Sequence, residues 1–250
     1  MSAERTAAAP EPVVTPKLIF AFVAMCVGMF MAILDIQIVA SSLAEIQAGL
    51  SASSSEIAWV QTAYLIAEIV MIPLTGYLTR ALSTRYLFAI AAGGFTLMSI
   101  LCATATSIEQ MIVWRAAQGF IGGAMIPVVF SAAFTVFPKK QQAIVASIVG
   151  LIATLAPTIG PTIGGILTNA FSWHWLFLIN VAPGLLVTIA VIALVDFDKP
   201  DFSLLRRLDW PGLITLAIFL GTLEYVLEEG AGNDWFQDRS ILISAIVSTI

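Results

Sequence analysis

Four ionisable side chains interrupt apolar stretches of this sequence, and they are its first candidates for chemistry. Asp35, Glu68, Arg115 and Glu224 each have mainly hydrophobic neighbours on both sides. A charge near the centre of a bilayer costs about 2.5 to 3.5 kcal/mol on insertion scales, so each group should face a partner or a water-filled cavity. The pattern therefore predicts a polar site inside a membrane-spanning protein.

Asp35 and Arg115 are predicted to lie at the same depth. Asp35 precedes the predicted outer end of its helix at Ser41 by six residues, and Arg115 follows the outer start of its helix at Glu109 by six residues. At 1.5 Å per residue, both groups lie about 9 Å below the outer boundary. We predict an ion pair that opens when Asp35 takes up a proton. The alternative is a permanent buried pair that only holds the helices together.

Glu68 is predicted to lie near the midplane, eleven residues after Ile57, with no basic residue at matching depth. A carboxylate there can exchange protons or attract a cationic substrate; the alternative is a protonated Glu68 that is hydrogen-bonded to a neighbouring helix. Glu224 is followed by Glu228 and Glu229, so it could also line only a wet outer edge. The predicted substrate cavity contains Glu68, Gln37, Gln118 and Glu224.

The composition excludes a soluble protein. Hydrophobic residues make up 59% of the 250 residues and charged residues only 11%, whereas a soluble domain has about 25% charged residues. The sequence has no P-loop, no metal-spaced His/Cys cluster, no Ser/His/Asp grouping and no basic patch for nucleic acid. We therefore expect neither an enzyme nor a metal or cofactor site. Cys26 and Cys102 are predicted to be small buried hydrophobes, and His174 to lie in an interfacial aromatic belt.

Apolar windows predict seven membrane-spanning helices and the start of an eighth. The seven are residues 18–40, 57–78, 86–105, 111–137, 143–167, 175–195 and 212–227. The eighth begins at Ile241 and reaches the last residue, Ile250, before it could cross a bilayer. We therefore expect the sequence to be a fragment of a longer chain.

The distribution of positive charge predicts the orientation. Nine of the eleven Lys and Arg residues fall in the N-terminal tail or in even-numbered loops, and only Arg239 falls in an odd-numbered loop. The positive-inside rule then predicts a multi-pass inner-membrane protein with a cytoplasmic N-terminus. The predicted domains are a disordered cytoplasmic tail (1–16), a six-helix bundle (17–195), a cytoplasmic linker (196–210), and helix 7 with the start of helix 8 (211–250).

Two helices carry small residues and prolines at spacings that favour close packing. The fifth predicted helix contains Pro157, Gly160, Pro161, Gly164 and Gly165. Proline removes a backbone donor and bends a helix, and glycine lets another helix approach closely. The fourth predicted helix has glycines at a similar spacing, at positions 119, 122 and 123. Static packing is the alternative to a role in transport for both segments.

Several segments together resemble the drug:proton antiporters of the major facilitator superfamily, specifically the fourteen-helix, EmrB-like group. Residues 34–39 resemble its helix 1 motif, 114–119 its helix 4 motif and 156–165 its helix 5 antiporter motif. Residues 173–184 resemble the segment that enters helix 6, and 208–212 and 233–236 the borders of helix 7. The likeness covers nearly the whole chain beyond the tail.

The resemblance implies two six-helix bundles with helices 7 and 8 inserted between them, of which this chain holds one bundle, helix 7 and the start of helix 8. It implies export of amphiphilic drugs, driven by the proton gradient without a cofactor. From their charge and depth, we predict that Asp35, Arg115 and Glu68 couple proton movement to transport. A periplasmic adaptor and an outer-membrane channel would be partners in bacteria with two membranes. The gating loop would contain Gly76, Arg80 and Arg85, although Arg80 stands where the superfamily usually has Asp and Ser83 where it has Gly.

Two other functions are compatible with such a fold. One is an importer of a small polar solute, and the other is a membrane receptor or scaffold that transports nothing. Drug-sensitivity and uptake assays separate the first from an exporter. A proton-linked flux in liposomes excludes the second.

Overall fold

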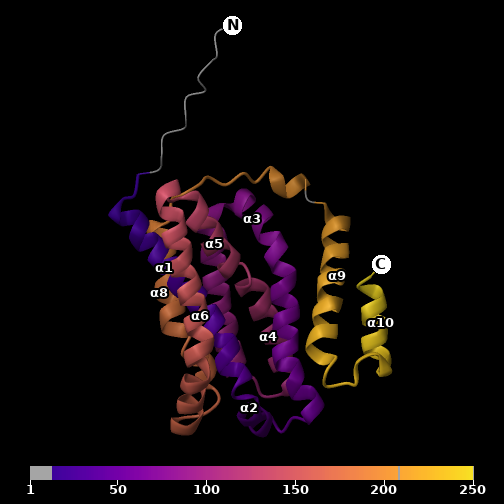
Figure 1. The fold of residues 1–250 in the computed structure, drawn as a ribbon. Helices are drawn as coiled ribbons and strands as arrows, with labels where there is room; N and C mark the ends of the chain where they lie inside the picture. The colour runs from indigo at the N-terminus through magenta and orange to yellow at the C-terminus, as the bar shows by residue number, and fades with distance from the viewer. Residues whose placement is uncertain (1–12, 208, 250) are drawn as a thin grey trace, which may run out of the picture.

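The computed structural model describes residues 13–207 and 209–249, and within that part every regular element is a helix (Figure 1). The helices are α1 (Pro16–Ala40), α2 (Leu43–Leu50), α3 (Ser54–Ala103), α4 (Ile108–Gly122), α5 (Met125–Thr135), α6 (Lys139–Ala170), α7 (Trp175–Leu178), α8 (Val181–Leu194), η1 (Leu204–Arg207), α9 (Trp210–Glu229), η2 (Trp235–Gln237) and α10 (Arg239–Val247). Most of the predicted tail, residues 1–12, lies outside the described residues.

Among the described residues, six helices are long and apolar enough to cross a membrane. They are Pro16–Ala40, Ser54–Ala103, Ile108–Thr135, Lys139–Ala170, Trp175–Leu194 and Trp210–Glu229. They cover the seven predicted spans to within two residues at each end, because Ser54–Ala103 includes both the second and the third. Figure 1 shows them as an upright bundle with α9 and α10 along one side.

The predicted loop between the second and third spans is helical on both sides of a single break at Ser83. Ser83 has φ 75° and ψ 157°, a conformation that glycine adopts readily and that costs another residue about 1 to 3 kcal/mol. The backbone N–H of Thr84 donates to the carboxylate of Asp198 at 2.9 Å, which caps the second half of α3. The linker that follows α8 thus holds the break in place.

Two predicted spans are interrupted within the bundle. The fourth changes from α4 to α5 at Gly123 and Ala124, and the sixth changes from α7 to α8 at Ile179 and Asn180. Such interruptions at membrane depth are tolerated where neighbouring protein covers the backbone. The second interruption places Asn180, which is 2% exposed, in the interior of the bundle.

Glycines form two close seams between helices. A Cβ added to Gly123 would lie 3.0 Å from the backbone oxygen of Glu68, and one added to Gly119 would clash with the backbone oxygen of Tyr64, so α4 packs directly on α3. A Cβ on Gly160 would lie 2.5 Å from the Cβ of Gln37, so α6 packs on α1 in the same way. Small residues at such seams allow two helix backbones to approach.

The apolar core consists of two clusters, one at each end of the bundle. The first lies toward the end at which α1 begins and includes Met25 and Phe95. The second lies toward the opposite end and includes Ile38 and Phe177. Along α3, α4 and α7–α8, a buried polar residue separates members of one cluster from members of the other, and on α1 Asp35 directly follows Leu34, the first member of the second cluster.

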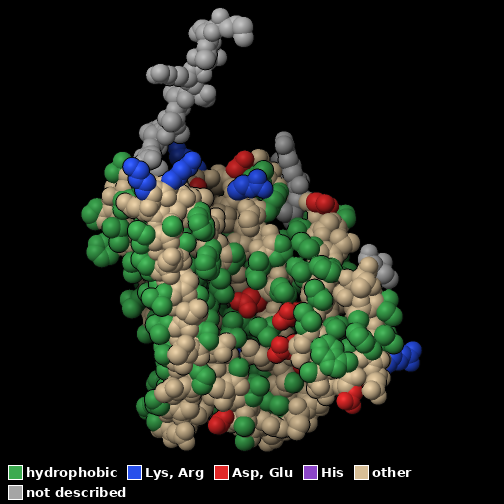
Figure 2. Space-filling model, in the orientation of Figure 1, with side chains coloured by type: hydrophobic (Ala, Val, Ile, Leu, Met, Phe, Trp, Pro, Cys, Tyr) green, Lys and Arg blue, Asp and Glu red, His purple; other side chains and the backbone are tan. Residues whose placement is uncertain are grey.

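Charged side chains mark the two ends differently. Figure 2 shows most of the Lys and Arg side chains on this face at the end where α1 begins, while acidic side chains occur at both ends and in the middle of the face. We call the first end the basic end. It carries Lys17, Arg80, Arg85, Lys139, Lys140 and Lys199.

Candidate proton-coupling site

The predicted ion pair between Asp35 and Arg115 is present in the structure. Arg115 Nη1 lies 2.6 Å from Asp35 Oδ2, and both side chains are 0% exposed. Arg115 Nε also donates to the backbone oxygen of Val60 at 3.3 Å, and the guanidinium lies 4.1 Å from the ring centroid of Tyr64. A buried charge pair needs further hydrogen bonds to compensate for lost hydration, and these contacts supply part of them for Arg115.

Five side chains close a ring of hydrogen bonds around this pair. Asn180 Nδ2 donates to Asp35 Oδ1 at 2.7 Å and to Ser99 Oγ at 3.3 Å. Arg115 Nη1 donates to Gln118 Oε1 at 2.7 Å, and Gln118 Nε2 donates to Ser99 Oγ at 2.7 Å. We call these five side chains the polar ring. It joins α1, the second half of α3, α4 and the α7–α8 junction, so a change at one member reaches four parts of the bundle.

One donor of the polar ring is unused. Within the part of the chain that the structure describes, Arg115 Nη2 is buried and has no hydrogen-bond partner, and the same holds for the hydroxyl of Tyr64. An unpaired buried polar group is costly. Arg115 Nη2 and the Tyr64 hydroxyl are therefore free to bind a water molecule or a carboxylate that changes position.

Sequence reasoning missed two members of the polar ring. Asn180 is the one strongly polar side chain in the predicted span 175–195, and a buried amide in an apolar helix requires partners. That signal could have identified it. Ser99 carried no such signal, because a serine can bond to its own helix backbone.

Glu68 lies on α3 one turn after Tyr64 and within electrostatic range of the polar ring. Its side chain is 8% exposed, and Oε1 has no partner among the described residues. Arg115 attracts this carboxylate, while Asp35 and Glu224 repel it. Helical spacing explains the proximity, since Glu68 is one turn from Tyr64, whose ring covers the Arg115 guanidinium.

The remaining predicted cavity residues are found in three different settings. Gln118 is 0% exposed and belongs to the polar ring, so it lines no cavity in this conformation. Gln37 is half-buried, with its Cβ against Gly160. Glu224 is half-buried on α9, where Glu228 repels it.

Helix α9 brings Glu224 near Glu68 because α9 packs on the first half of α3. The rings of Trp59 and Tyr225 stack with centroids 5.5 Å apart, and Thr62 Oγ1 donates to Glu229 Oε1 at 2.5 Å. The carboxylates of α3 and α9 thus share one side of the bundle. Figure 2 shows acidic side chains in this middle region of the face.

The predicted antiporter motif on α6 has one packed edge and one open face. Gly160 and Gly164 are buried against α1, and a Cβ on Gly164 would lie 2.8 Å from Ser41 Oγ. Pro157 and Pro161 lie inside the helix with exposed side chains, and a Cβ on Gly165 would meet nothing within 4 Å. Gly160 and Gly164 therefore serve the packing of α6 on α1, whereas Pro157, Pro161 and Gly165 do not.

The predicted gating residues lie at the basic end, beside the Ser83 break. Arg85 Nη2 pairs with Asp196 Oδ1 at 3.0 Å. Gly76 and Arg80 line a cavity of about 630 Å³ between α3, α5 and the linker after α8. The linker carboxylates of Asp196 and Asp198 contact Arg85 and Thr84, just after the Ser83 break.

The two cysteines and the histidine have the following settings in the structure. Cys26 and Cys102 are free and buried. His174 precedes α7 and stacks on Trp173, with ring centroids 3.8 Å apart. No group of three or more His, Cys, Asp or Glu that could hold a metal occurs in residues 13–207 or 209–249.

Comparison with known proteins identifies the family. The Major Facilitator Superfamily sequence signature matches residues 25–246, and the chain belongs to this superfamily. It is similar to the colistin resistance protein EmrB of Acinetobacter baumannii, with 49% identity over 229 residues, covering 92% of this chain and 45% of that protein. It is also 31% identical over 245 residues to the probable multidrug resistance protein EmrY of Escherichia coli K12, covering 98% of this chain and 48% of that protein.

The chain spans about half the length of the curated relatives it matches. Among solved structures, the D-xylose-proton symporter matches with a TM-score of 0.63 and 13% identity, covering 92% of this chain and 65% of that one. That likeness shows the fold alone. The predicted fold class, an all-α membrane protein of the major facilitator superfamily, is confirmed.

Proposed function

We propose that this chain is the N-terminal part of a proton-coupled exporter that moves hydrophobic or amphiphilic drugs out of the cell across the inner membrane. The observation that carries the proposal is the fully buried ion pair of Asp35 and Arg115 within the polar ring. The names of the resistance proteins to which the chain is similar support drugs as substrates. The energy source is the proton gradient, and no cofactor takes part.

Asp35 couples protons to helix movement because its charged and neutral forms hold different partners. Ionised Asp35 accepts charge-assisted hydrogen bonds from Arg115 at 2.6 Å and from Asn180 at 2.7 Å. A proton on the carboxylate removes the negative charge and weakens both contacts. The conformation with an opened ring then becomes more populated, and loss of the proton to the cell interior restores the closed ring.

Glu68 supplies attraction for cationic substrates in the same proposal. It is a buried carboxylate with a free oxygen near the middle of the bundle. Attraction to a cation is weakly screened in such surroundings. Glu224 on α9 adds a second negative charge to that side of the bundle.

The proposed orientation places the basic end in the cytoplasm and the N-terminus with it. Substituted-cysteine labelling of the full-length protein tests this directly. Ser53 and Asn233 should react with a membrane-impermeant reagent from outside, and Gln141 and Ser203 only from inside. Labelling of Gln141 from outside contradicts the orientation.

Transport by purified full-length protein in proteoliposomes tests the function. An imposed proton gradient should drive concentrative movement of an amphiphilic dye. Proton-driven uptake of a polar solute without dye movement would identify an importer, and the absence of any proton-linked flux would identify a receptor or scaffold. We also propose that a periplasmic adaptor and an outer-membrane channel act with the protein, which co-purification after cross-linking tests.

A further inference from the structure

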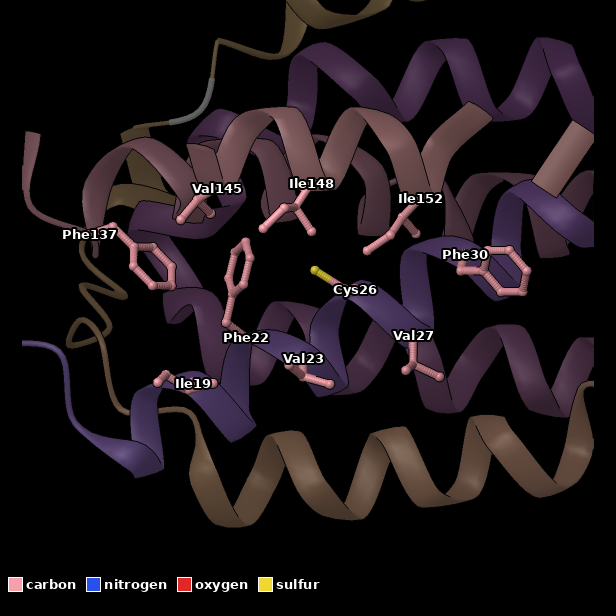
Figure 3. A pocket seen from close by; sticks show the side chains of 10 residues that line it. All are labelled: Ile19, Phe22, Val23, Cys26, Val27, Phe30, Phe137, Val145, Ile148 and Ile152. Carbon is pink, nitrogen blue, oxygen red and sulfur yellow. The ribbon is translucent and has the colours of Figure 1, made fainter. Parts of the chain in front are cut away.

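An apolar groove lies between α1 and α6, away from the polar ring (Figure 3). Its volume is about 400 Å³, and Cys26 Sγ contributes the only side-chain atom in its lining that is not carbon. In Figure 3 the side chains of Phe22 and Cys26 on α1 point toward Ile148 and Ile152 on α6. We call this feature the α1–α6 groove.

The glycine contacts between α1 and α6 lie beyond one end of the groove. Near the end opposite the basic end, Gly160 and Gly164 let α6 lie directly on α1. Toward the basic end the glycines are replaced by branched side chains, and Phe22 meets Phe137 edge to face with ring centroids 4.9 Å apart. Bulky groups there hold the two helices apart.

The groove matches one leaflet of a bilayer in length and in character. Its lining on α1 runs from Ile19 to Phe30, about 16 Å at 1.5 Å per residue. Half of a hydrocarbon core of roughly 30 Å is about 15 Å. Val23 and Ile148 at its rim are each 50% exposed. A single acyl chain that runs along α1 therefore fits the groove from the interface to the midplane.

Positive charges stand at the basic end of the groove. Lys139 and Lys140 are the first residues of α6, just after the groove residue Phe137, and both are exposed. The first turn of α6 contains no acidic residue. Lys17 lies at the start of α1. Asp196 lines the same small cavity as Lys17, and its carboxylate forms an ion pair with Arg85. Figure 2 shows basic side chains together at this end.

We propose that the α1–α6 groove binds one acyl chain of an anionic phospholipid from the leaflet at the basic end, and that Lys139 and Lys140 bind its phosphate. Basic side chains beside a membrane span favour anionic lipid through the charge of the headgroup, and the groove adds a place for the chain. The inference rests on the membrane position of the bundle and not on drug export. Lipid binding can therefore fail while export is shown, and export can fail while lipid binding is shown.

Native mass spectrometry of the full-length protein, titrated with phosphatidylglycerol or phosphatidylethanolamine of identical chains, tests the site. The wild type should retain phosphatidylglycerol more tightly. The double variant Lys139→Gln/Lys140→Gln should lose this preference, with a drop of roughly fivefold per lysine. Glycerol 3-phosphate, which has the same charge without acyl chains, should not displace the lipid.

A second pair of variants tests the groove. Ile148→Trp fills it and should weaken binding of phosphatidylglycerol, whereas Ile214→Trp, at a similarly exposed position on α9 (56% exposed), should not. Melting curves of all variants confirm that each is folded. Equal affinity for the two lipids, displacement by glycerol 3-phosphate, or equal effects of the two tryptophans would overturn the proposal. Displacement by an amphiphilic drug at low concentration would do so too, because it would assign the groove to substrate.

Discussion

Asn180 donates its hydrogen bond to Asp35 Oδ1, the carboxylate oxygen that Arg115 leaves free, so each oxygen of the buried acid has its own donor. The two donors come from different parts of the bundle, α4 and the α7–α8 junction. Asp35 on α1 is therefore the shared acceptor that links them. This arrangement defines what each change at the site should do.

The first prediction concerns Asp35→Asn, which resembles the protonated acid in shape and charge. It should abolish concentrative dye export in proteoliposomes and leave membrane insertion and dye binding intact, because the residue can no longer alternate between charged and neutral forms. Glu45→Gln, which neutralises an exposed acid on α2, is the control. Normal gradient-driven export by Asp35→Asn would make Asp35 a structural residue.

The second prediction concerns Arg115 and uses a double-mutant cycle. Arg115→Gln leaves the Asp35 charge buried without its cation, and such a change typically costs about 3 to 5 kcal/mol. The double variant Asp35→Asn/Arg115→Gln should recover much of the loss, since no buried charge remains. Unfolding of the detergent-solubilised protein measures both. Additive losses would show that the pair contributes nothing as a pair.

The third prediction concerns Asn180, whose removal leaves Asp35 Oδ1 without its donor. Asn180→Ala should lower the stability of the protein by about 1 to 3 kcal/mol, the cost of a buried polar group left unsatisfied. Asn169→Ala is the matched control, because Asn169 is exposed and its amide bonds only to the backbone of its own helix. Equal effects of the two variants would contradict a special role for the α7–α8 junction.

The fourth prediction concerns Glu68 and substrate charge. Glu68→Gln should reduce export of cationic dyes far more than export of neutral or acidic compounds, because it removes a buried attraction that water screens weakly. Glu224→Gln should have the same selectivity with a smaller effect, since Glu224 is only half-buried. Equal loss for all compounds would point to proton coupling or folding instead.

The fifth prediction separates the glycines of the α6 motif. Gly160→Ala should destabilise the protein by about 1 to 3 kcal/mol, because its Cβ would lie 2.5 Å from that of Gln37. Gly165→Ala should be neutral or slightly stabilising, since its Cβ meets nothing within 4 Å. Thermal unfolding and dye export of the two variants provide the comparison. If Gly165→Ala lost export while its stability was unchanged, Gly165 would be needed for the movement of α6 during transport.

The fold could be predicted from the sequence because membrane spans depend on length and hydropathy, which are local properties. The interruptions could not. The change from α7 to α8 at Asn180 and the helical path through the predicted gating loop depend on contacts with other helices and with the linker, such as Thr84 with Asp198. Residues 114 positions apart cannot be paired from hydropathy.

The site was predicted in part for the same reason. The partnership of Asp35 and Arg115 followed from equal depth, which residue counting gives. Two other placements depend on which side of each helix faces inward: Glu68 lies where the charge of Arg115 acts on it, and Gln118 lies inside the polar ring. In a helix that is apolar all round, the sequence carries little information about that direction.

The cap that Asp198 provides for Thr84 sets an order of events during synthesis. The two residues are 114 positions apart, and a ribosome that adds about 5 to 20 residues per second needs roughly 6 to 23 s to cover that distance. The third span therefore enters the membrane with its first turn uncapped, and it is completed only after the sixth span has been made. A chain that leaves the ribosome before Asp198 has been added keeps an uncapped N–H at Thr84, which the quality-control machinery of the cell can recognise.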